Sequence, residues 1–383
     1  MCESSELRHS WSYVCITPRQ PYTRPPGDEL YVHIRAKERL PDLNPSRWRS
    51  LYVEFHGAII STLLPNPQIF NRLQNLSLQG TDMQWHIASL HYLPALADLR
   101  MKVTTAQWEG ICPPFDFGFS FPSLRLMSIE NFEYRTTIIA MIYASDGVET
   151  LTVTNAVDRK YHTAGLPATF PKLHTLTFRK PLHCPASNRL YVAPDVLGYC
   201  GNWDFPALTR LCIDDRREHG PDPPPTGIVD NILRRPDIAG RLTYLRLCLP
   251  SGPLDAIVTQ VATMDSLTHF ALYNPETTRP KVESMDDALG DALNTVSHLL
   301  ENHSSPPSFP SLEKFDYYTP FIRASATFPP LFRFILAVWR NSSRSVFSSR
   351  FPKSACVLPQ EILDASAEGL SVVCDLERFV DLY

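Results

Sequence analysis

Residues 121–130 read FPSLRLMSIE, and close copies return as FPKLHTLTF from 170, FPALTRLCI from 205 and FPSLEKFDY from 309. With 20 Phe and 35 Pro among 383 residues, chance gives about two Phe-Pro pairs, whereas five occur that also carry Leu two positions after the proline. Proline fixes φ and holds the preceding residue in an extended conformation. The phrase therefore indicates a repeated device that ends one element and directs the chain into a strand.

A spacing pattern extends this phrase along the chain. Each copy continues as apolar-x-x-apolar-x-apolar, and we use the middle apolar residue as the marker of a unit. Six of the nine steps between successive markers are 23 to 28 residues long, which fits a strand-and-return repeat with occasional insertions. The markers are Leu51, Leu76, Leu99, Met127, Leu151, Leu176, Leu211, Leu245, Phe270 and Phe315.

Each unit offers a strand followed by a helix. Period-two alternation in ETLTVTN and HTLTFRK is typical of short strands with one buried face. Apolar residues at helical spacing predict helices at 254–261 and at 289–300, the latter with Ser284 as the N-cap, and residues 328–340 and 359–368 also read as helices. Neither half can bury its apolar face alone, so about ten irregular units are expected to stack as an α/β solenoid with a parallel sheet on the concave face and helices on the convex face.

Three segments are expected along the chain. Residues 1–45 read as flanking strands at 11–17 and 30–36, residues 46–320 as the solenoid, and residues 321–383 as a helical cap that ends in a final strand at LSVVC. The Phe-Pro pair at Phe328 follows the last marker too closely for another unit, so it is expected to open a helix.

Composition narrows the class of protein. A formal charge of −4 and a pI near 6.3 give no basic footprint for nucleic acid. Nine scattered cysteines form no CxxC pair, and the N-terminus has no signal-peptide pattern. The most apolar window, 328–339, is too short to span a membrane. We therefore expect a cytoplasmic or nuclear protein that binds neither membranes nor nucleic acid.

Local motifs for catalysis are missing from the sequence. It contains no GxSxG, GxxxxGK[ST], GxGxxG or HExxH, so no cofactor or catalytic residue is predicted. The densest His/Cys cluster joins His183 and Cys184 to the neighbouring His174 and Cys200, and its spacing fits no common zinc pattern. We predict no metal site.

The order WSYVCIT, ELYVHIRAK, RWRSLYVEF, the FPxL phrases and the closing AEGLSVVCDLE resembles the divergent F-box/leucine-rich-repeat proteins of mushroom-forming fungi. In that family an N-terminal F-box binds the Skp-type adaptor of a cullin-RING ubiquitin ligase, and the repeats select substrates. The F-box itself is missing here, and LPQEIL at 358–363 matches an F-box opening but is followed by too few residues. The resemblance implies a substrate-recognition region.

In a leucine-rich-repeat strand the residues beside the marker point onto the open concave face. Arg and Tyr are common interface anchors, so the candidate protein-binding residues are Arg100, Lys102, Arg179, Arg210, Tyr244, Arg246, Tyr273 and Tyr318. His269, Lys314 and Asp316 satisfy the same positional rule. The five cations among the candidates suggest a positive strip for an acidic or phosphorylated ligand, and a merely solvated sheet face is the alternative.

The sequence therefore favours a non-catalytic protein-binding module that acts in ubiquitin-ligase targeting, with a protein ligand on the concave face and a Skp-type adaptor as a further partner. Three alternatives stay open. The chain could be a repeat scaffold without a ligase link, its F-box could lie upstream of this start, or it could be an enzyme whose site is built from the loops after Ile213 and Leu272.

Overall fold

The structure is a computed structural model of the 383-residue chain. It describes residues 30–35, 48–55, 70–80, 93–103, 121–130, 141–142, 144–154, 168–180, 203–215, 233–248, 254–273, 283–301, 309–318, 328–341, 347–350 and 358–373. Its contacts divide the chain into a first unit, Met1–Ala164 with Ala168–Lys172, and a second unit, Gly165–Pro167 with Leu173–Tyr383. The three segments expected from the sequence stay a prediction.

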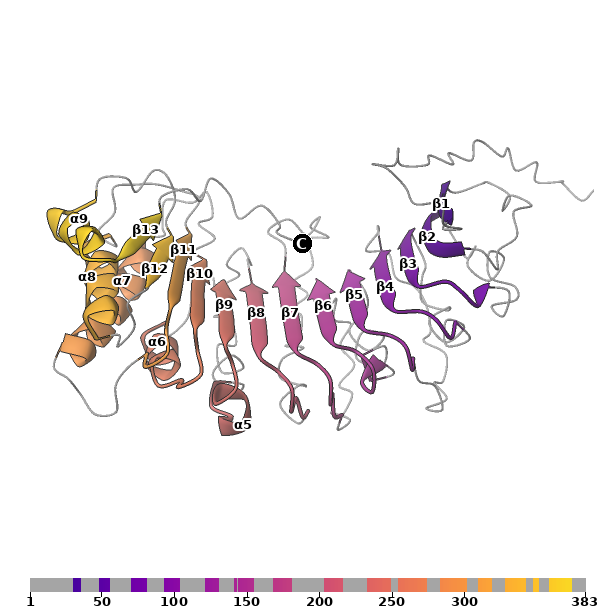
Figure 1. Ribbon diagram of the computed structural model, residues 1–383, viewed down its shortest axis with the longest axis horizontal. Coiled ribbons are helices and arrows are strands. Elements are labelled where there is room, and N and C mark those ends of the chain that lie inside the picture. Colours follow the sequence, from indigo (N-terminus) through magenta and orange to yellow (C-terminus); the bar gives the residue numbers. More distant parts are fainter. Residues whose placement is uncertain are drawn as a thin grey trace, which may run out of the picture. The chain divides into compact units, whose positions relative to one another are not determined.

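The described part of the first unit contains parallel strands that neighbour one another in chain order (Figure 1). They are β1 (Leu30–Arg35), β2 (Trp48–Phe55), β3 (Asn75–Gly80), β4 (Asp98–Val103), β5 (Leu126–Glu130) and β6 (Thr150–Thr154). The strand predicted at 30–36 is confirmed as β1, whereas the one predicted at 11–17 lies outside the described residues.

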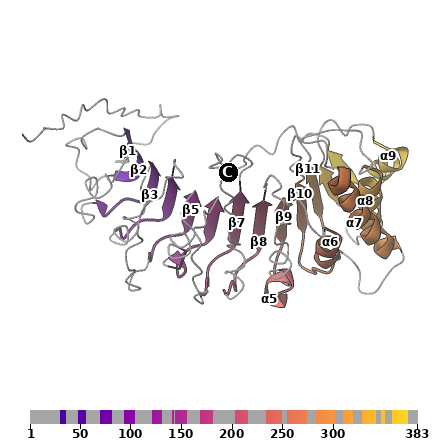
Figure 2. The same ribbon diagram turned by 180° about the vertical axis from the view of Figure 1, so that it is seen from behind.

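The second unit repeats this order with parallel strands and several helices. Its strands are β7 (Thr175–Lys180), β8 (Arg210–Asp215), β9 (Tyr244–Cys248), β10 (His269–Tyr273), β11 (Lys314–Tyr318), β12 (Ser348–Arg350) and β13 (Ser371–Val373). Its helices are α5 (Pro236–Ala239), α6 (Leu254–Ala262), α7 (Glu283–Glu301), α8 (Phe328–Asn341) and α9 (Gln360–Ala367). Figure 2 shows α7, α8 and α9 gathered beside β11 to β13. The predicted fold class, an α/β solenoid of leucine-rich-repeat type, is confirmed.

The strand register confirms the marker residues. In the first unit the register aligns Leu51, Leu76, Leu99, Met127 and Leu151 across β2 to β6. In the second unit it aligns Leu176, Leu211, Leu245, Phe270 and Phe315 across β7 to β11. None of the ten is more than 3% exposed, and burying each such side chain is worth about 1.5–3 kcal/mol. The markers therefore form the apolar spine of each unit.

The Phe-Pro phrase folds as a tight turn just before the strand. The amide N of Leu124 donates to the carbonyl O of Phe121 at 3.1 Å, with the proline at the second turn position that its fixed φ favours. The same bond joins Phe205 to Leu208 and Phe309 to Leu312, with the Phe and Leu side chains buried in each copy. The phrase is thus a turn that directs the chain into the strand and places two side chains in the core.

Within each unit, backbone hydrogen bonds join neighbouring layers ahead of the strand. The carbonyl two residues before a marker accepts two amide N–H groups from the following layer, as Thr243 does from Thr268 and His269 at 3.0 and 2.9 Å. In the second unit threonine hydroxyls reinforce these joints. Each hydroxyl donates to the carbonyl of the preceding layer that also accepts the two amide N–H groups, as Thr209, Thr243 and Thr268 do. Threonine thus supplies lateral bonds in repeats that lack the regular asparagine of many leucine-rich repeats.

The helices predicted at 254–261, 328–340 and 359–368 are confirmed as α6, α8 and α9. Two details differ from the sequence prediction. Helix α7 begins at Glu283, so Ser284 lies inside the helix and is not its N-cap. Strand β12 was not predicted, because Ser349 takes the place of an apolar marker. Its hydroxyl is fully buried and donates to the Phe315 carbonyl at 3.0 Å, so the polar group is satisfied in the core.

An aromatic cluster fixes α8 against the strands of the second unit. Helix α8 buries Leu331, Phe334, Ile335 and Val338, which share one face at helical spacing. The Phe334 ring lies 5.1 Å from the ring of Phe315, in the edge-to-face arrangement that aromatic pairs favour. Phe334 also contacts Phe309 with ring centroids 5.5 Å apart, and Phe309 has a positive φ of 54°. This backbone conformation is uncommon outside glycine, so aromatic packing maintains it.

Candidate protein-binding surface

The side chains that alternate with the buried markers lie on the other face of each sheet, here called the strand face. In the second unit the register aligns them in rows that cross the strands. The first row, one residue before the markers, contains Thr175, Arg210, Tyr244, His269, Lys314 and Ser348. The second row, one residue after the markers, contains Thr177, Cys212, Arg246, Ala271, Asp316 and Arg350.

A chain of contacts runs along the first row. The Arg210 guanidinium carbon lies 4.4 Å from the centroid of the Tyr244 ring, which is a cation–π distance. The Tyr244 ring meets His269 edge to face with centroids 4.6 Å apart. His269 in turn places Nε2 at 2.8 Å from Oδ2 of Asp316 in the second row. Four neighbouring strands, β8 to β11, therefore contribute to one connected group, here called the platform.

Asp316 anchors the end of the platform. Its side chain is only 9% exposed, and Oδ2 also accepts an ion pair from Lys314 Nζ at 3.2 Å. Burial by itself raises the pKa of this carboxyl, but the hydrogen bond and electrostatic interaction with His269 and the ion pair with Lys314 outweigh it, so the pKa lies below its usual value. Asp316 is therefore ionised at neutral pH and fixes the orientation of the His269 ring.

The structure corrects one expectation about the second row. Arg246 was expected on an open face, but it is only 8% exposed. Its Nη2 lies 3.7 Å from Oδ2 of Asp214 on the neighbouring strand β8, and Asp214 is itself 7% exposed. A buried guanidinium requires such a counter-charge, so this pair explains why Arg246 does not stand free in a positive strip.

Cys212 is the buried cysteine of the second row. Burial raises the pKa of its thiol above the usual value, although the positive charge of Arg246 and a hydrogen bond with Thr177 act in the opposite direction. A thiol with a raised pKa stays protonated at neutral pH, and the thiolate is the reactive form. Cys212 therefore has the properties of a core residue and not of a nucleophile.

The strand face of the first unit holds the candidates Arg100 and Lys102. Arg100 donates from Nε and Nη2 to both carboxylate oxygens of Asp98, at 3.2 and 3.0 Å. Lys102 Nζ lies 2.8 Å from Oε1 of Glu130 on the neighbouring strand. The cations of this face are thus matched by carboxylates of the same face.

The remaining candidates are less informative. Arg179 lies at the end of β7 and is half-buried. Tyr273 and Tyr318 end β10 and β11, but their side chains lie outside the described residues. The structure therefore brings Arg210 and Tyr244 together, whereas Arg100 and Lys102 belong to the other unit.

Sequence reasoning missed Arg350 as a strand-face residue. It pairs in register with Asp316, and it was overlooked because β12 was not predicted. The pattern VFSSRF does carry apolar residues on both sides of Ser349 at repeat spacing, so a rule that allowed a polar marker would have found it.

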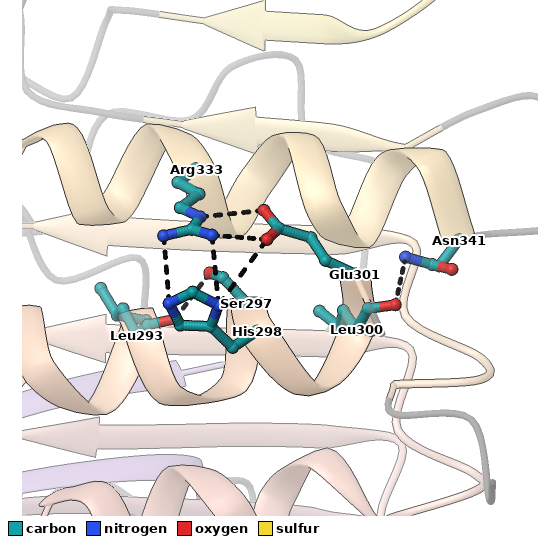
Figure 3. Close-up of polar contacts among 7 residues, drawn as sticks. All are labelled: Leu293, Ser297, His298, Leu300, Glu301, Arg333 and Asn341. Carbon is teal, nitrogen blue, oxygen red and sulfur yellow. Dashed lines mark hydrogen bonds and ion pairs between the residues drawn. The ribbon is translucent and has the colours of Figure 1, made fainter. Parts of the chain in front are cut away.

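A second polar cluster joins helices α7 and α8 (Figure 3). Arg333 on α8 donates from Nε to Oε1 of Glu301 at 2.9 Å and from Nη2 to Oε2 at 2.5 Å. This hydrogen-bonded ion pair holds the pKa of Glu301 below its usual value. Asn341 donates to the Leu300 carbonyl at 3.2 Å, which satisfies a carbonyl in the last turn of α7.

His298 lies beside the same guanidinium in Figure 3. Its two ring nitrogens lie 3.3 Å from Nη2 and Nη1 of Arg333 in matching pairs. Both ring nitrogens face the guanidinium at hydrogen-bond distance, so α7 meets Arg333 with His298 as well as with Glu301. The cluster is therefore a clamp between two helices.

The described residues also bear on metal and membrane sites. They contain no group of three or more His, Cys, Asp and Glu residues that could hold a metal ion. His174 places Nδ1 at 3.1 Å from the Ala207 carbonyl, and its predicted neighbours His183, Cys184 and Cys200 lie outside the described residues. No helix in the described part of the chain is long and apolar enough to cross a membrane.

Comparison with protein-family models gives no match for this chain, and comparison with curated proteins gives none either. The fold and the chemistry of the strand face therefore carry the functional argument.

Proposed function

We propose that this chain is a non-catalytic protein-binding module that uses the strand face of its second unit. The observation that carries the proposal is the platform, in which exposed Arg210 rests on Tyr244 and Tyr244 on His269. Arg and Tyr are the residue types most enriched at interface hot spots. Their mutual contacts restrict their rotamers before any partner arrives, which lowers the entropic cost of binding.

A ligase link is the finer part of the proposal. The sequence resembles the substrate-recognition region of F-box/leucine-rich-repeat proteins, and that resemblance is its support. In this role the platform would hold the substrate, and a Skp-type adaptor would connect the chain to a cullin-RING ubiquitin ligase. Both parts can be tested with the same experiment.

The experiment is affinity capture of the intact chain from an extract of its native cells, followed by mass spectrometry. Three chains are compared: wild type, the double variant Arg210→Ala/Tyr244→Ala, and the control Arg100→Ala. All three should fold, because the altered side chains lie on the strand face and are not buried. We expect a set of proteins that wild type and Arg100→Ala capture and that the double variant loses.

Identical captured sets for all three folded chains would contradict the use of this face. Recovery of a Skp-type adaptor with a cullin would support the ligase link. Site-dependent capture without the adaptor would contradict the link and leave the protein-binding module standing.

A further inference from the structure

Arg210 differs from the other cations of the platform. It is exposed, its guanidinium carbon lies over the Tyr244 ring, and none of the described carboxylates forms an ion pair with it. By contrast, Lys314 pairs with Asp316, although its ammonium has three N–H donors and can also bind a second carboxylate. A guanidinium that lies over an aromatic ring keeps N–H donors that the ring does not engage, and these can match a carboxylate in two parallel hydrogen bonds.

The charge balance of the strand face points to the sign of the partner. Among residues with described side chains, the second unit places five cations on this face against two carboxylates, an excess of three positive charges. The cations are Arg179, Arg210, Arg246, Lys314 and Arg350, and the carboxylates are Asp214 and Asp316. The chain as a whole has a formal charge of −4, so this excess is local. A local positive surface attracts acidic segments and disfavours basic ones.

The spacing of the cations distinguishes a carboxylate-rich segment from a single phosphate. Arg210 on β8 and Lys314 on β11 share the first row and are separated by three strand intervals, which is about 14 Å at about 4.8 Å per interval. A single phosphate cannot contact both Arg210 and Lys314 across this distance, so a ligand that engages both must carry separated charges. An extended peptide advances about 3.3 Å per residue, so about four residues cover the distance.

We infer that the platform binds an extended acidic segment of a partner protein, with two carboxylates about four residues apart that reach Arg210 and Lys314. The segment crosses the strands along the first row. Arg210 is the main anchor, and Tyr244, His269 and Asp316 act through it by holding its position. This inference rests on the proposed protein-binding function and names the chemistry of the ligand.

Fluorescence anisotropy with labelled peptides tests the inference on the full chain. The probe is a nine-residue Gly/Ser peptide with two Asp residues four positions apart. Three matched peptides carry Asn at both positions, two adjacent Asp residues, or one phosphoserine. We expect the spaced Asp peptide to bind about tenfold more tightly than the Asn peptide, since a charge-assisted hydrogen bond corresponds to about that factor. The difference should shrink as NaCl is added, because exposed charges are screened.

Variants locate the effect. Arg210→Gln should weaken binding of the spaced Asp peptide about tenfold, and Arg100→Gln in the first unit should leave it unchanged. Arg210→Lys should restore only part of the affinity, because lysine keeps the charge but loses the planar fork. Equal affinity for the Asp and Asn peptides, or equal losses in the Arg210 and Arg100 variants, would overturn the inference. Tighter binding of the adjacent-Asp or phosphoserine peptide would also overturn it.

Competition separates this inference from the proposed function. Proteins captured through Arg210 and Tyr244 should be released by an excess of the spaced Asp peptide and not by the Asn peptide. If capture depends on these residues but the acidic peptide has no effect, the binding module stands and the acidic ligand is wrong. If capture of no protein depends on Arg210 and Tyr244, the proposed function is wrong. The peptide titrations then still test whether the platform binds an acidic segment.

Discussion

The two units of this chain share a fold and differ in the chemistry of their strand faces. Both contain parallel strands whose markers form a buried apolar spine. Both also join their layers through backbone carbonyls at the same position, two residues before a marker. In the first unit Arg100 and Lys102 find carboxylate partners on their own face. Among the described side chains on the strand face of the second unit, cations outnumber carboxylates, and the Arg210 guanidinium lies over a tyrosine ring. This difference shows that the buried markers determine the architecture of the solenoid. The strand-face residues that alternate with them can vary and so determine which ligand is bound.

The largest loss of stability is expected when a charged residue replaces a buried marker in the spine of either unit. Leu245→Asp in the second unit and Leu76→Asp in the first each bury an unpaired carboxylate at a fully buried marker, and each should cost at least about 4 kcal/mol of unfolding free energy. Urea denaturation measures the loss, and hydrogen exchange shows where protection disappears. We expect Leu245→Asp to expose amides of β7 to β11 more than those of β2 to β6.

The matched control for this pair is Ser128→Asp, which places the same charge on the strand face and should change stability little. Equal loss of protection in both units for either core variant would show one cooperative structure and remove the basis for treating the units separately.

An intermediate effect is expected at Asp316. Because the folded chain lowers the pKa of this carboxyl, Asp316 stabilises the fold above its unfolded pKa of about 3.9, and the contribution is lost as the pH falls through the lower folded value. Asp316→Asn should therefore cost about 2 kcal/mol at neutral pH, in the range of hydrogen bonds to charged groups. The gap between wild type and variant should narrow in urea titrations below about pH 4.

Glu130→Gln is the counterpart in the first unit. Its partner Lys102 is 44% exposed, and surface ion pairs of this kind contribute about 0–1 kcal/mol, so little change is expected. A cost for Glu130→Gln equal to that for Asp316→Asn would mean that burial of the second unit's polar network has no energetic consequence.

The smallest effect concerns the turn that precedes two strands. Phe309 has a positive φ, a region that glycine enters without strain, so Phe309→Gly should be at least as stable as Phe309→Ala. At Phe121, in the same position of the turn in the first unit, glycine should be about 0.5–1 kcal/mol less stable than alanine. Thermal and urea unfolding of the four variants gives the two differences. The same order at both positions would refute a special backbone at Phe309.

The sequence was sufficient for the architecture because each layer repeats one local rule. Ten markers with apolar neighbours at fixed spacing predicted the strands and their register, and α6 and α7 followed from helical periodicity. The rule failed where a hydrogen bond replaced apolar burial, as at Ser349 in β12. That substitution is invisible to a pattern based on hydrophobicity.

The candidate surface was predictable only in part. The alternation rule identified Arg210 and Tyr244 as strand-face residues, and the structure places them in contact. The same rule did not predict that Arg246 is buried. Burial of its guanidinium depends on the carboxylate of Asp214, which lies on another strand, and the strand register brings the two together. Pairing across layers is a property of the assembled sheet, so exposure on this face could not be derived from any one repeat.

The carbonyls that accept two N–H groups from the next layer have an evolutionary consequence. Each of these hydrogen-bonded joints uses backbone atoms in the short stretch before a strand. The joint therefore places little constraint on the side-chain types there, and no constraint on the length of the segment that precedes it. Marker intervals of very different length, such as 23 residues before Leu99 and 45 before Phe315, lead to the same joint. Insertions and deletions between layers are thus mutations that selection can tolerate, and each is an opportunity to vary a loop without rebuilding the scaffold.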